Sequence, residues 1–169
     1  MTHLETERLI LRSVNHEVIK DLYEIWKTDF VQKYNVMKVV PFSEYQESME
    51  KELSLDNLCV VLKESDTVIG HITMSDDSIR YRVNSIMISY WLKQEHSNQG
   101  YMSEALGSLL DYLFYTKKYD LVTARVFSDN KASLSLLLKL GFQQEGYLRR
   151  AVKNYQDKIF DDVLFVKFK

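Results

Sequence analysis

The chain has 169 residues, of which 46% are hydrophobic and 27% charged, and its formal net charge is −2. This length and composition predict a single globular domain over residues 1–169, long enough to bury a sizeable core. The weak negative charge argues against a nucleic-acid-binding protein, because such proteins gather positive charge on one face. No apolar run reaches the ~18 residues of a membrane span, and the first residues lack the pattern of a signal peptide. We therefore expect a cytoplasmic protein without a membrane partner.

The N-terminal third of the chain predicts one strand followed by two helices. The strand is the apolar run 9–11, and apolar residues at helical spacing then predict a helix over 16–26 with Asn15 as its N-cap. A second helix is predicted from Ser43, because residues 43–46 match a capping box.

Three strands are predicted next, over 58–62, 68–74 and 83–92. The polar residues 63–67 suit a hairpin turn between the first two of these strands. The single cysteine, Cys59, lies within an apolar run, so we interpret it as a small buried hydrophobic residue and not as a catalytic thiol.

The clearest helix follows Gly100, because one apolar stripe has spacings of three and four throughout: Met102, Ala105, Leu106, Leu109, Leu110, Leu113 and Phe114. A strand over 121–127, a short helix over about 131–140 ending at Gly141, and final strands up to residue 168 complete the chain. The helix between two successive strands implies a parallel crossover in an otherwise antiparallel sheet. The pattern therefore predicts a mixed α/β fold.

The segment from Gln94 to Ala105 is a polar loop that runs from a strand into this long helix. Backbone N–H groups at a helix N-terminus bind anions, and Gly100 would allow a ligand to approach the backbone closely. The segment alone is a common structural feature, and the chain contains neither a P-loop nor a Gly-x-Gly-x-x-Gly motif. Nucleotide hydrolysis and dinucleotide redox chemistry are therefore disfavoured.

A second motif, Asn130-Lys131-Ala132-Ser133, makes the glycine turn more informative. With it, the chain resembles the GNAT superfamily of N-acetyltransferases, and most of all the group that contains bacterial ribosomal-protein N-terminal acetyltransferases. The resemblance covers almost the whole chain, and it rests also on four further segments in the right order: residues 4–12, Val68-Ile69-Gly70, Tyr90-Trp91-Leu92 and Leu140-Gly141-Phe142 followed by Glu145-Gly146.

The resemblance implies the GNAT fold, a twisted and mostly antiparallel mixed sheet with a splayed pair of parallel strands and flanking helices. It implies acetyl-CoA as co-substrate, no metal, and Ser133 as a candidate catalytic hydroxyl near the thioester sulfur. Asn130 would contact the pantetheine arm. The other expected cofactor-binding residues are Tyr90, Trp91, Leu92, Ser97, Asn98, Gln99, Gly100, Tyr101, Met102 and Ser103.

Two positions depart from the family pattern. The family usually has Gly-x-Gly in the turn, where this chain has Asn98-Gln99-Gly100, and asparagine tolerates left-handed backbone geometry. Many relatives also carry a glutamate where this chain has Met87, which removes the usual route of amine deprotonation.

The remaining candidates for acid–base chemistry each have a structural interpretation as well. His71 is a candidate base or a packed histidine, His96 a neighbour of the cofactor, and Glu104 a carboxylate favoured by the helix dipole. Tyr101 and Tyr155 are spare candidates for the general acid. Many relatives place a tyrosine acid where this chain has 136–138, three leucines that we interpret as core.

Three functions follow from the sequence as alternatives. The protein transfers an acetyl group to a protein N-terminal α-amine, transfers it to a small amine such as a polyamine, amino sugar or antibiotic, or binds acetyl-CoA without catalysis. An α-amine, with a pKa of about 8, is easier to deprotonate than a lysine amine at about 10.4, which favours the first function where no strong base is evident.

We expect the first two helices and the late loop from Tyr147 to Lys158 to line the acceptor pocket, and the protein to be a monomer or a homodimer.

Overall fold

The computed structural model describes residues 3–53 and 57–169. Its strands form one eight-stranded sheet in the order β1-β2-β3-β4-β5-β6-β8-β7. All neighbouring pairs are antiparallel except β5 and β6. The strands are β1 His3–Glu5, β2 Leu9–Ser13, β3 Asn57–Leu62, β4 Thr67–Ser75, β5 Ser85–Leu92, β6 Leu121–Phe127, β7 Gln143–Lys153 and β8 Ile159–Phe168.

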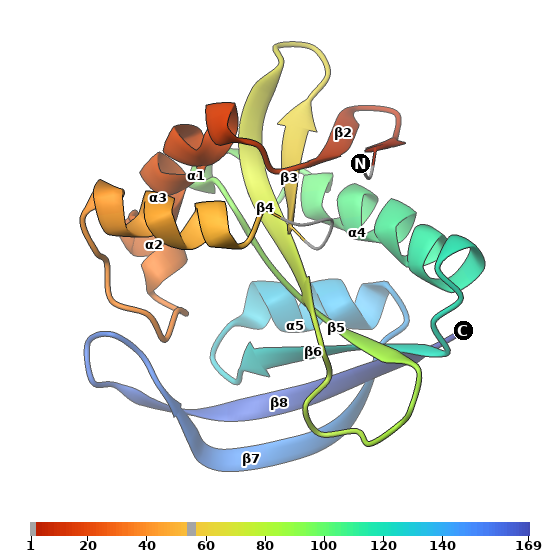
Figure 1. Ribbon diagram of the computed structural model, residues 1–169. Coiled ribbons are helices and arrows are strands. Elements are labelled where there is room, and N and C mark those ends of the chain that lie inside the picture. The colour runs from red at the N-terminus through yellow and green to blue at the C-terminus, as the bar shows by residue number, and fades with distance from the viewer. Residues whose placement is uncertain (1–2, 54–56) are drawn as a thin grey trace.

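Helices cover both faces of this sheet (Figure 1). Those of the N-terminal part, α1 Ile19–Trp26, α2 Asp29–Gln32 and α3 Phe42–Lys51, lie together at one end of the molecule. The other two are α4 Tyr101–Asp111, extended by a π-helical turn over Tyr112–Thr116, and α5 Lys131–Lys139. In the described part of the chain, no helix combines the length and the apolar character needed to cross a membrane.

Two apolar cores hold these layers together. The larger lies between the sheet and the pair α4 and α5, and the smaller lies under α1 and α3 on the opposite face. Strand β3 supplies both, because Leu58 and Val60 face the first core while Cys59 and Val61 face the second. Such burial on both faces explains why residues 58–62 of this strand form an unbroken apolar run. Cys59 is fully buried, as expected, and burial raises the pKa of its thiol.

The order of elements predicted from the sequence is confirmed, with differences at their ends. Asn15 does cap the first helix, accepting hydrogen bonds from the Glu17 and Val18 N–H groups, but the first turn is a 3₁₀ turn. The predicted capping box at Ser43 is wrong, because α3 begins one residue earlier, after Pro41, and has no side-chain cap. The fixed φ of proline and its lack of an N–H group are tolerated at a helix start.

The boundaries of other elements also differ from the sequence prediction. Strand β5 begins at residue 85 instead of 83, and the short β1 and α2 were not predicted as separate elements. Their three or four residues are too few for a periodic pattern to show.

The parallel pair separates along its length. Residues of β5 pair with β6 only from Ser85 to Ile88, whereas β5 stays paired with β4 as far as Leu92. Gly70 of β4 permits this, since a Cβ atom there would lie 2.7 Å from the Trp91 carbonyl oxygen. Strand β6 remains paired with β8 as far as Phe127. The sheet therefore divides into two halves, β1–β5 and β6–β8–β7, that meet over part of one strand pair.

Candidate active site

A cavity of about 630 Å³ lies where β5 and β6 separate. One wall is formed by the end of β5, the turn before α4 and the first residues of α4, and another by α5 and the loop before it. The segment from Phe30 to Asn35 forms the remaining wall. The lining residues are Phe30, Val31, Lys33, Tyr34, Asn35, Tyr90, Trp91, Leu92, His96, Ser97, Asn98, Gly100, Tyr101, Met102, Ser103, Asp129, Asn130, Lys131, Ala132, Ser133, Ser135, Leu136 and Lys139.

The structure brings the predicted site residues together around this cavity, with one exception. Tyr90, Trp91, Leu92, Asn130 and Ser133 line it, as do the residues predicted from the turn: Ser97, Asn98, Gly100, Tyr101, Met102 and Ser103. Gln99 does not line it, and its carbonyl oxygen instead accepts a hydrogen bond from Arg8 Nη1 at 3.1 Å.

The turn before α4 has the backbone geometry of an anion site. Asn98 has a φ of 59° and Gly100 a φ of 81°, so both adopt the left-handed conformation, and the expectation that asparagine can replace the first glycine is confirmed. Gly100 is the N-cap of α4, whose first N–H groups have no partner within the helix. These groups and the positive end of the helix dipole favour a negatively charged ligand.

The donors around the cavity fit the two chemical parts of coenzyme A. Beyond Ile88, the β5 edge that faces β6 has no strand partner within residues 3–53 and 57–169, so its backbone groups can bind an extended amide chain such as pantetheine. Among the residues that the structure describes, three lysines and one carboxylate line the cavity, namely Lys33, Lys131, Lys139 and Asp129. This local excess of positive charge suits a polyphosphate, although the whole chain is weakly acidic.

Ser133 is not needed to cap its helix. The side chain of Asn130 does this, since its Oδ1 accepts a hydrogen bond from the Ser133 N–H at 3.2 Å. The Ser133 hydroxyl instead lies 2.7 Å from the hydroxyl of Tyr90. Burial raises the pKa of Tyr90 to about 12, so this phenol stays protonated. The pair therefore places a serine hydroxyl, oriented by a neutral tyrosine, on the cavity wall.

The interpretation of the leucines at 136–138 as core is only partly right. Leu137 is fully buried, but Leu138 is 58% exposed and Leu136 lines the cavity. One turn of a short helix cannot bury three consecutive side chains against a single face.

Of the candidate bases considered from the sequence, His71 and Glu104 lie outside the cavity and only His96 lines it. His71 of β4 is buried, and its ring centroid lies 5.2 Å from that of Trp91. Burial lowers the pKa of His71 to about 4. It does not line the cavity, and neither does Met87. His96 does line the cavity, and its ring meets the ring of Tyr101 edge-on, with 6.0 Å between the two centroids. Glu104 is bonded to Thr6 and Arg8 on the side of β2.

The wall formed by residues 30–35 was not foreseen. Neither the helix predicted over 16–26 nor the helix predicted from Ser43 lines the cavity, and the late loop over 147–158 does not line it either. The residues of this wall come instead from α2 and the segment after it, between those two helices. The late loop supports the wall, because Asn154 Nδ2 donates a hydrogen bond to the Lys33 carbonyl oxygen at 3.3 Å. Tyr34 is fixed there by its hydrogen bond to the Asp129 carbonyl oxygen at 3.0 Å. No motif indicated Tyr34, since its position depends on these long-range contacts.

The chain is similar in sequence to known N-acetyltransferases. The chain is 34% identical over 158 residues to the uncharacterized N-acetyltransferase p20 of Bacillus licheniformis, covering 88% of this chain and 86% of p20. It is 27% identical over 167 residues to the ribosomal-protein-serine acetyltransferase of Escherichia coli, covering 94% of this chain and 90% of that protein.

Solved structures share the fold at lower identity. An acetyltransferase from Bacillus anthracis superposes with a TM-score of 0.89 at 22% identity, over 99% of this chain and 98% of that one. RimL, a ribosomal L7/L12 alpha-N-protein acetyltransferase in complex with coenzyme A, superposes with a TM-score of 0.85 at 16% identity, over 99% and 98% of the two chains.

A family model describes the shared domain directly. The model of the acetyltransferase (GNAT) domain matches residues 8–143, which include β2, the splayed strands, the turn before α4 and α5. Members of this family use acetyl-CoA. The chain therefore belongs to the GNAT family and is an N-acetyltransferase.

Proposed function

We propose that this protein transfers the acetyl group of acetyl-CoA to the α-amine of a protein N-terminus. The observation that carries the proposal is the cavity between the separated strands, which joins an anion-binding helix N-terminus to a wall formed by residues 30–35. The turn and α5 would hold the cofactor, and the segment around Tyr34 would meet the acceptor. The similarity to the E. coli ribosomal-protein-serine acetyltransferase supports a protein acceptor.

Acetyl-CoA supplies an activated acetyl thioester. The chain's own residues then hold the reactants and move protons. The free edge of β5 at Ser89–Leu92 would bind the amide chain, and the turn at Ser97–Ser103 the pyrophosphate. Holding both reactants in one cavity supplies much of the rate enhancement.

The small number of possible bases on the cavity wall supports an α-amine as acceptor. Asp129 is the single carboxylate on the cavity wall formed by the described residues, and its Oδ2 faces Lys158 Nζ at 3.7 Å. Since an α-amine has a pKa of about 8, a useful fraction is neutral near pH 7 without help from the protein. A lysine amine with a pKa of about 10.4 would depend on a base placed against it, and the described residues of this wall offer only Asp129 and His96, the latter beside the turn that would hold the pyrophosphate.

Ser133 is the proposed general acid. Its hydroxyl would give a proton to the departing sulfur and recover one from solvent, and in this step the Tyr90 hydroxyl, 2.7 Å away, would act as the hydrogen-bond donor to Ser133 Oγ. Because Asn130 provides the helix cap, this role does not compete with capping.

A panel of acceptors tests the proposal. The purified protein is incubated with acetyl-CoA and peptides that begin with free Ser, Ala or Met, with the same peptides blocked at the N-terminus but carrying lysine, and with polyamines and amino sugars. Free thiol is followed by colorimetry and the product by mass spectrometry. We expect acetylation of free N-termini only. Turnover of small amines alone would establish the small-molecule alternative. Binding of acetyl-CoA without turnover of any acceptor would overturn the assignment of a protein acceptor and favour a binding module.

A further inference from the structure

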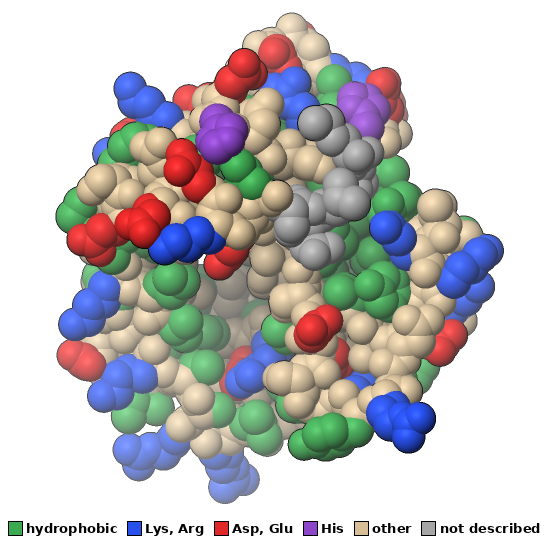
Figure 2. All heavy atoms as spheres, viewed as in Figure 1, with side chains coloured by type: hydrophobic (Ala, Val, Ile, Leu, Met, Phe, Trp, Pro, Cys, Tyr) green, Lys and Arg blue, Asp and Glu red, His purple; other side chains and the backbone are tan. Residues whose placement is uncertain are grey.

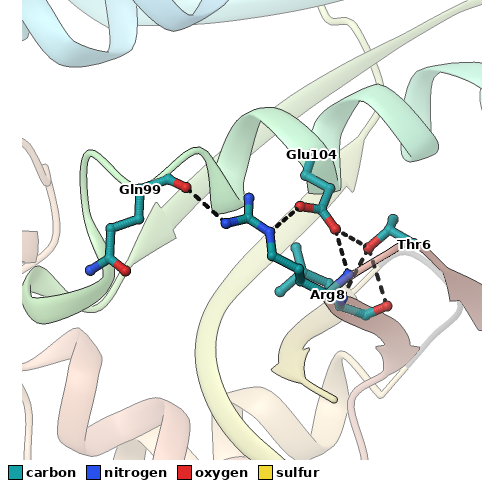
Figure 3. Close-up of polar contacts among 5 residues, drawn as sticks. Thr6, Arg8, Gln99 and Glu104 are labelled. Atoms are coloured by element: carbon teal, nitrogen blue, oxygen red, sulfur yellow. Dashed lines mark hydrogen bonds and ion pairs between the residues drawn. The ribbon is translucent and has the colours of Figure 1, made fainter. Parts of the chain in front are cut away.

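An arginine side chain outside the cavity holds the turn before α4 in place. Arg8, in the loop between β1 and β2, donates from Nε to Glu104 Oε2 at 2.7 Å and from Nη1 to the Gln99 carbonyl oxygen at 3.1 Å (Figure 3). Its guanidinium also lies over the ring of Tyr101, 4.3 Å from the centroid. One side chain thus contacts the turn, the first residue of α4 and its first helical turn.

Glu104 is held by three donors. Besides Arg8 Nε, its carboxylate accepts from the Arg8 N–H at 2.8 Å and from Thr6 Oγ1 at 2.6 Å (Figure 3). Partial burial favours the protonated acid, but these hydrogen bonds outweigh it, and the pKa of Glu104 lies below its usual value. The charge of Glu104, which would repel an anion at the start of α4, is therefore compensated by Arg8.

The bond to Gln99 fixes the direction of the peptide between Gln99 and Gly100. In a trans peptide the C=O and N–H groups point in opposite directions, so a carbonyl directed at Arg8 turns the Gly100 N–H away from Arg8. Gly100 lines the cavity and Arg8 does not. The left-handed residues Asn98 and Gly100 flank this peptide, and such backbone is costly unless neighbouring contacts fix it.

We propose that Arg8 and Glu104 form a clamp that preorganises the turn for the pyrophosphate of acetyl-CoA. They are positioning residues, because neither lines the cavity. The proposal rests on the proposed cofactor role of the turn, and it goes beyond that role by assigning affinity for the pyrophosphate to two residues outside the cavity. Arginine suits the clamp because its planar fork can bond a carboxylate and a carbonyl oxygen at once, which a lysine ammonium on a flexible stem cannot reproduce.

Acyl donors with and without a pyrophosphate test the clamp. Arg8→Gln, Arg8→Lys and Glu104→Gln are compared with wild type for KM and kcat, using acetyl-CoA, acetyl-dephospho-CoA and acetyl-pantetheine. We expect Arg8→Gln to raise the KM for both donors that carry the pyrophosphate by about tenfold or more, with kcat little changed. The KM for acetyl-pantetheine should stay within twofold of the wild-type value. Arg8→Lys should bring the KM for the two pyrophosphate donors only part of the way back to wild type.

A matched control is Arg12→Gln on β2, because Arg12 forms an ion pair with Asp66 at 3.4 Å, away from the turn. It should leave the KM for every donor unchanged. If Arg8→Gln fails to fold, Glu104→Gln provides the same comparison. If Arg8→Gln raised the KM for acetyl-pantetheine and for acetyl-CoA equally, or raised neither, the clamp proposal would be overturned. A wild-type protein that does not bind coenzyme A in calorimetry would instead overturn the proposed function of the site.

Discussion

At the scale of single residues, the Tyr90–Ser133 pair is the part of the site closest to chemistry. A general acid typically contributes ~10²–10⁴-fold to a rate. We therefore expect Ser133→Ala to lower kcat by roughly 100-fold while the KM for acetyl-CoA changes little. Tyr90→Phe keeps the ring but removes the hydroxyl that orients Ser133, so its loss of kcat should be smaller, about fivefold to tenfold. Steady-state kinetics measure both.

Ser135 provides the control for this prediction. It lies on the same helix and lines the same cavity, two residues beyond Ser133. Ser135→Ala should retain kcat. If Ser133→Ala keeps full activity, or if its loss appears only in KM, then Ser133 is a binding residue and not the acid.

His71 predicts how stability depends on pH. Burial lowers its pKa from 6.5 to about 4, so the unfolded chain binds a proton more readily than the folded one between these values. The contribution of neutral His71 is complete above pH 6.5 and is lost as the pH falls towards 4, by an amount on the order of 3 kcal/mol. Urea unfolding at pH 8, 6.5, 5.5 and 4.5 measures it. His71→Gln should flatten the curve above pH 4.5, and an unchanged slope would refute this account.

At the scale of elements, the turn before α4 shows how a short segment acquires a function. Its two left-handed residues place helix N–H groups on the cavity wall. Gly100→Val adds a branched side chain to a left-handed position, at a cost of about 1–2 kcal/mol, and we expect it to abolish the rise in melting temperature caused by acetyl-CoA. A ligand at ~100 times its Kd adds about 2.7 kcal/mol, which is easily seen by differential scanning fluorimetry.

Gly141 separates the backbone effect from the loss of binding. It has a φ of 80°, almost that of Gly100, but it follows α5 outside the cavity. Gly141→Val should therefore destabilise the protein by a similar amount and leave the acetyl-CoA shift intact. A Gly100→Val variant that retains the full shift would contradict the assignment of the turn.

Sequence periodicity predicted most elements because most strands and helices longer than about five residues have a buried face; β7 is an exception, since its residues are exposed or half-buried. The turn, Asn130 and Ser133 were predicted by resemblance, and they do lie together on one cavity wall. The start of α3 was predicted wrongly, because Pro41 and Ser43 both suit a helix start and the residue pattern does not choose between them. Tyr34 and Arg8 could not be predicted as parts of the site, since their contacts join segments about 90 residues apart in sequence.

At the scale of the whole molecule, the site depends on the division of the sheet. The halves β1–β5 and β6–β8–β7 are joined by the pairs from Ser85–Leu121 to Ile88–Ala124 and by the larger core. The surface is hollowed between the part that carries α2 and α3 and the part that carries β7 and β8 (Figure 2). An acceptor could approach the cavity wall at residues 30–35 through this hollow.

A ligand that contacts both halves of the sheet should reduce local opening in the backbone segments that it touches. Backbone groups of Ser89–Leu92 on the free β5 edge would gain partners from acetyl-CoA, and the amides of residues 98–103 would gain the pyrophosphate. We therefore expect acetyl-CoA to slow hydrogen–deuterium exchange in both segments, because exchange reports local opening. The β7–β8 hairpin makes its hydrogen bonds away from the cavity and provides the internal reference. Mass spectrometry of peptides from the three segments, with and without acetyl-CoA, measures the difference. Equal protection of all three would indicate global stabilisation only, and protection of β7 and β8 alone would place the cofactor elsewhere.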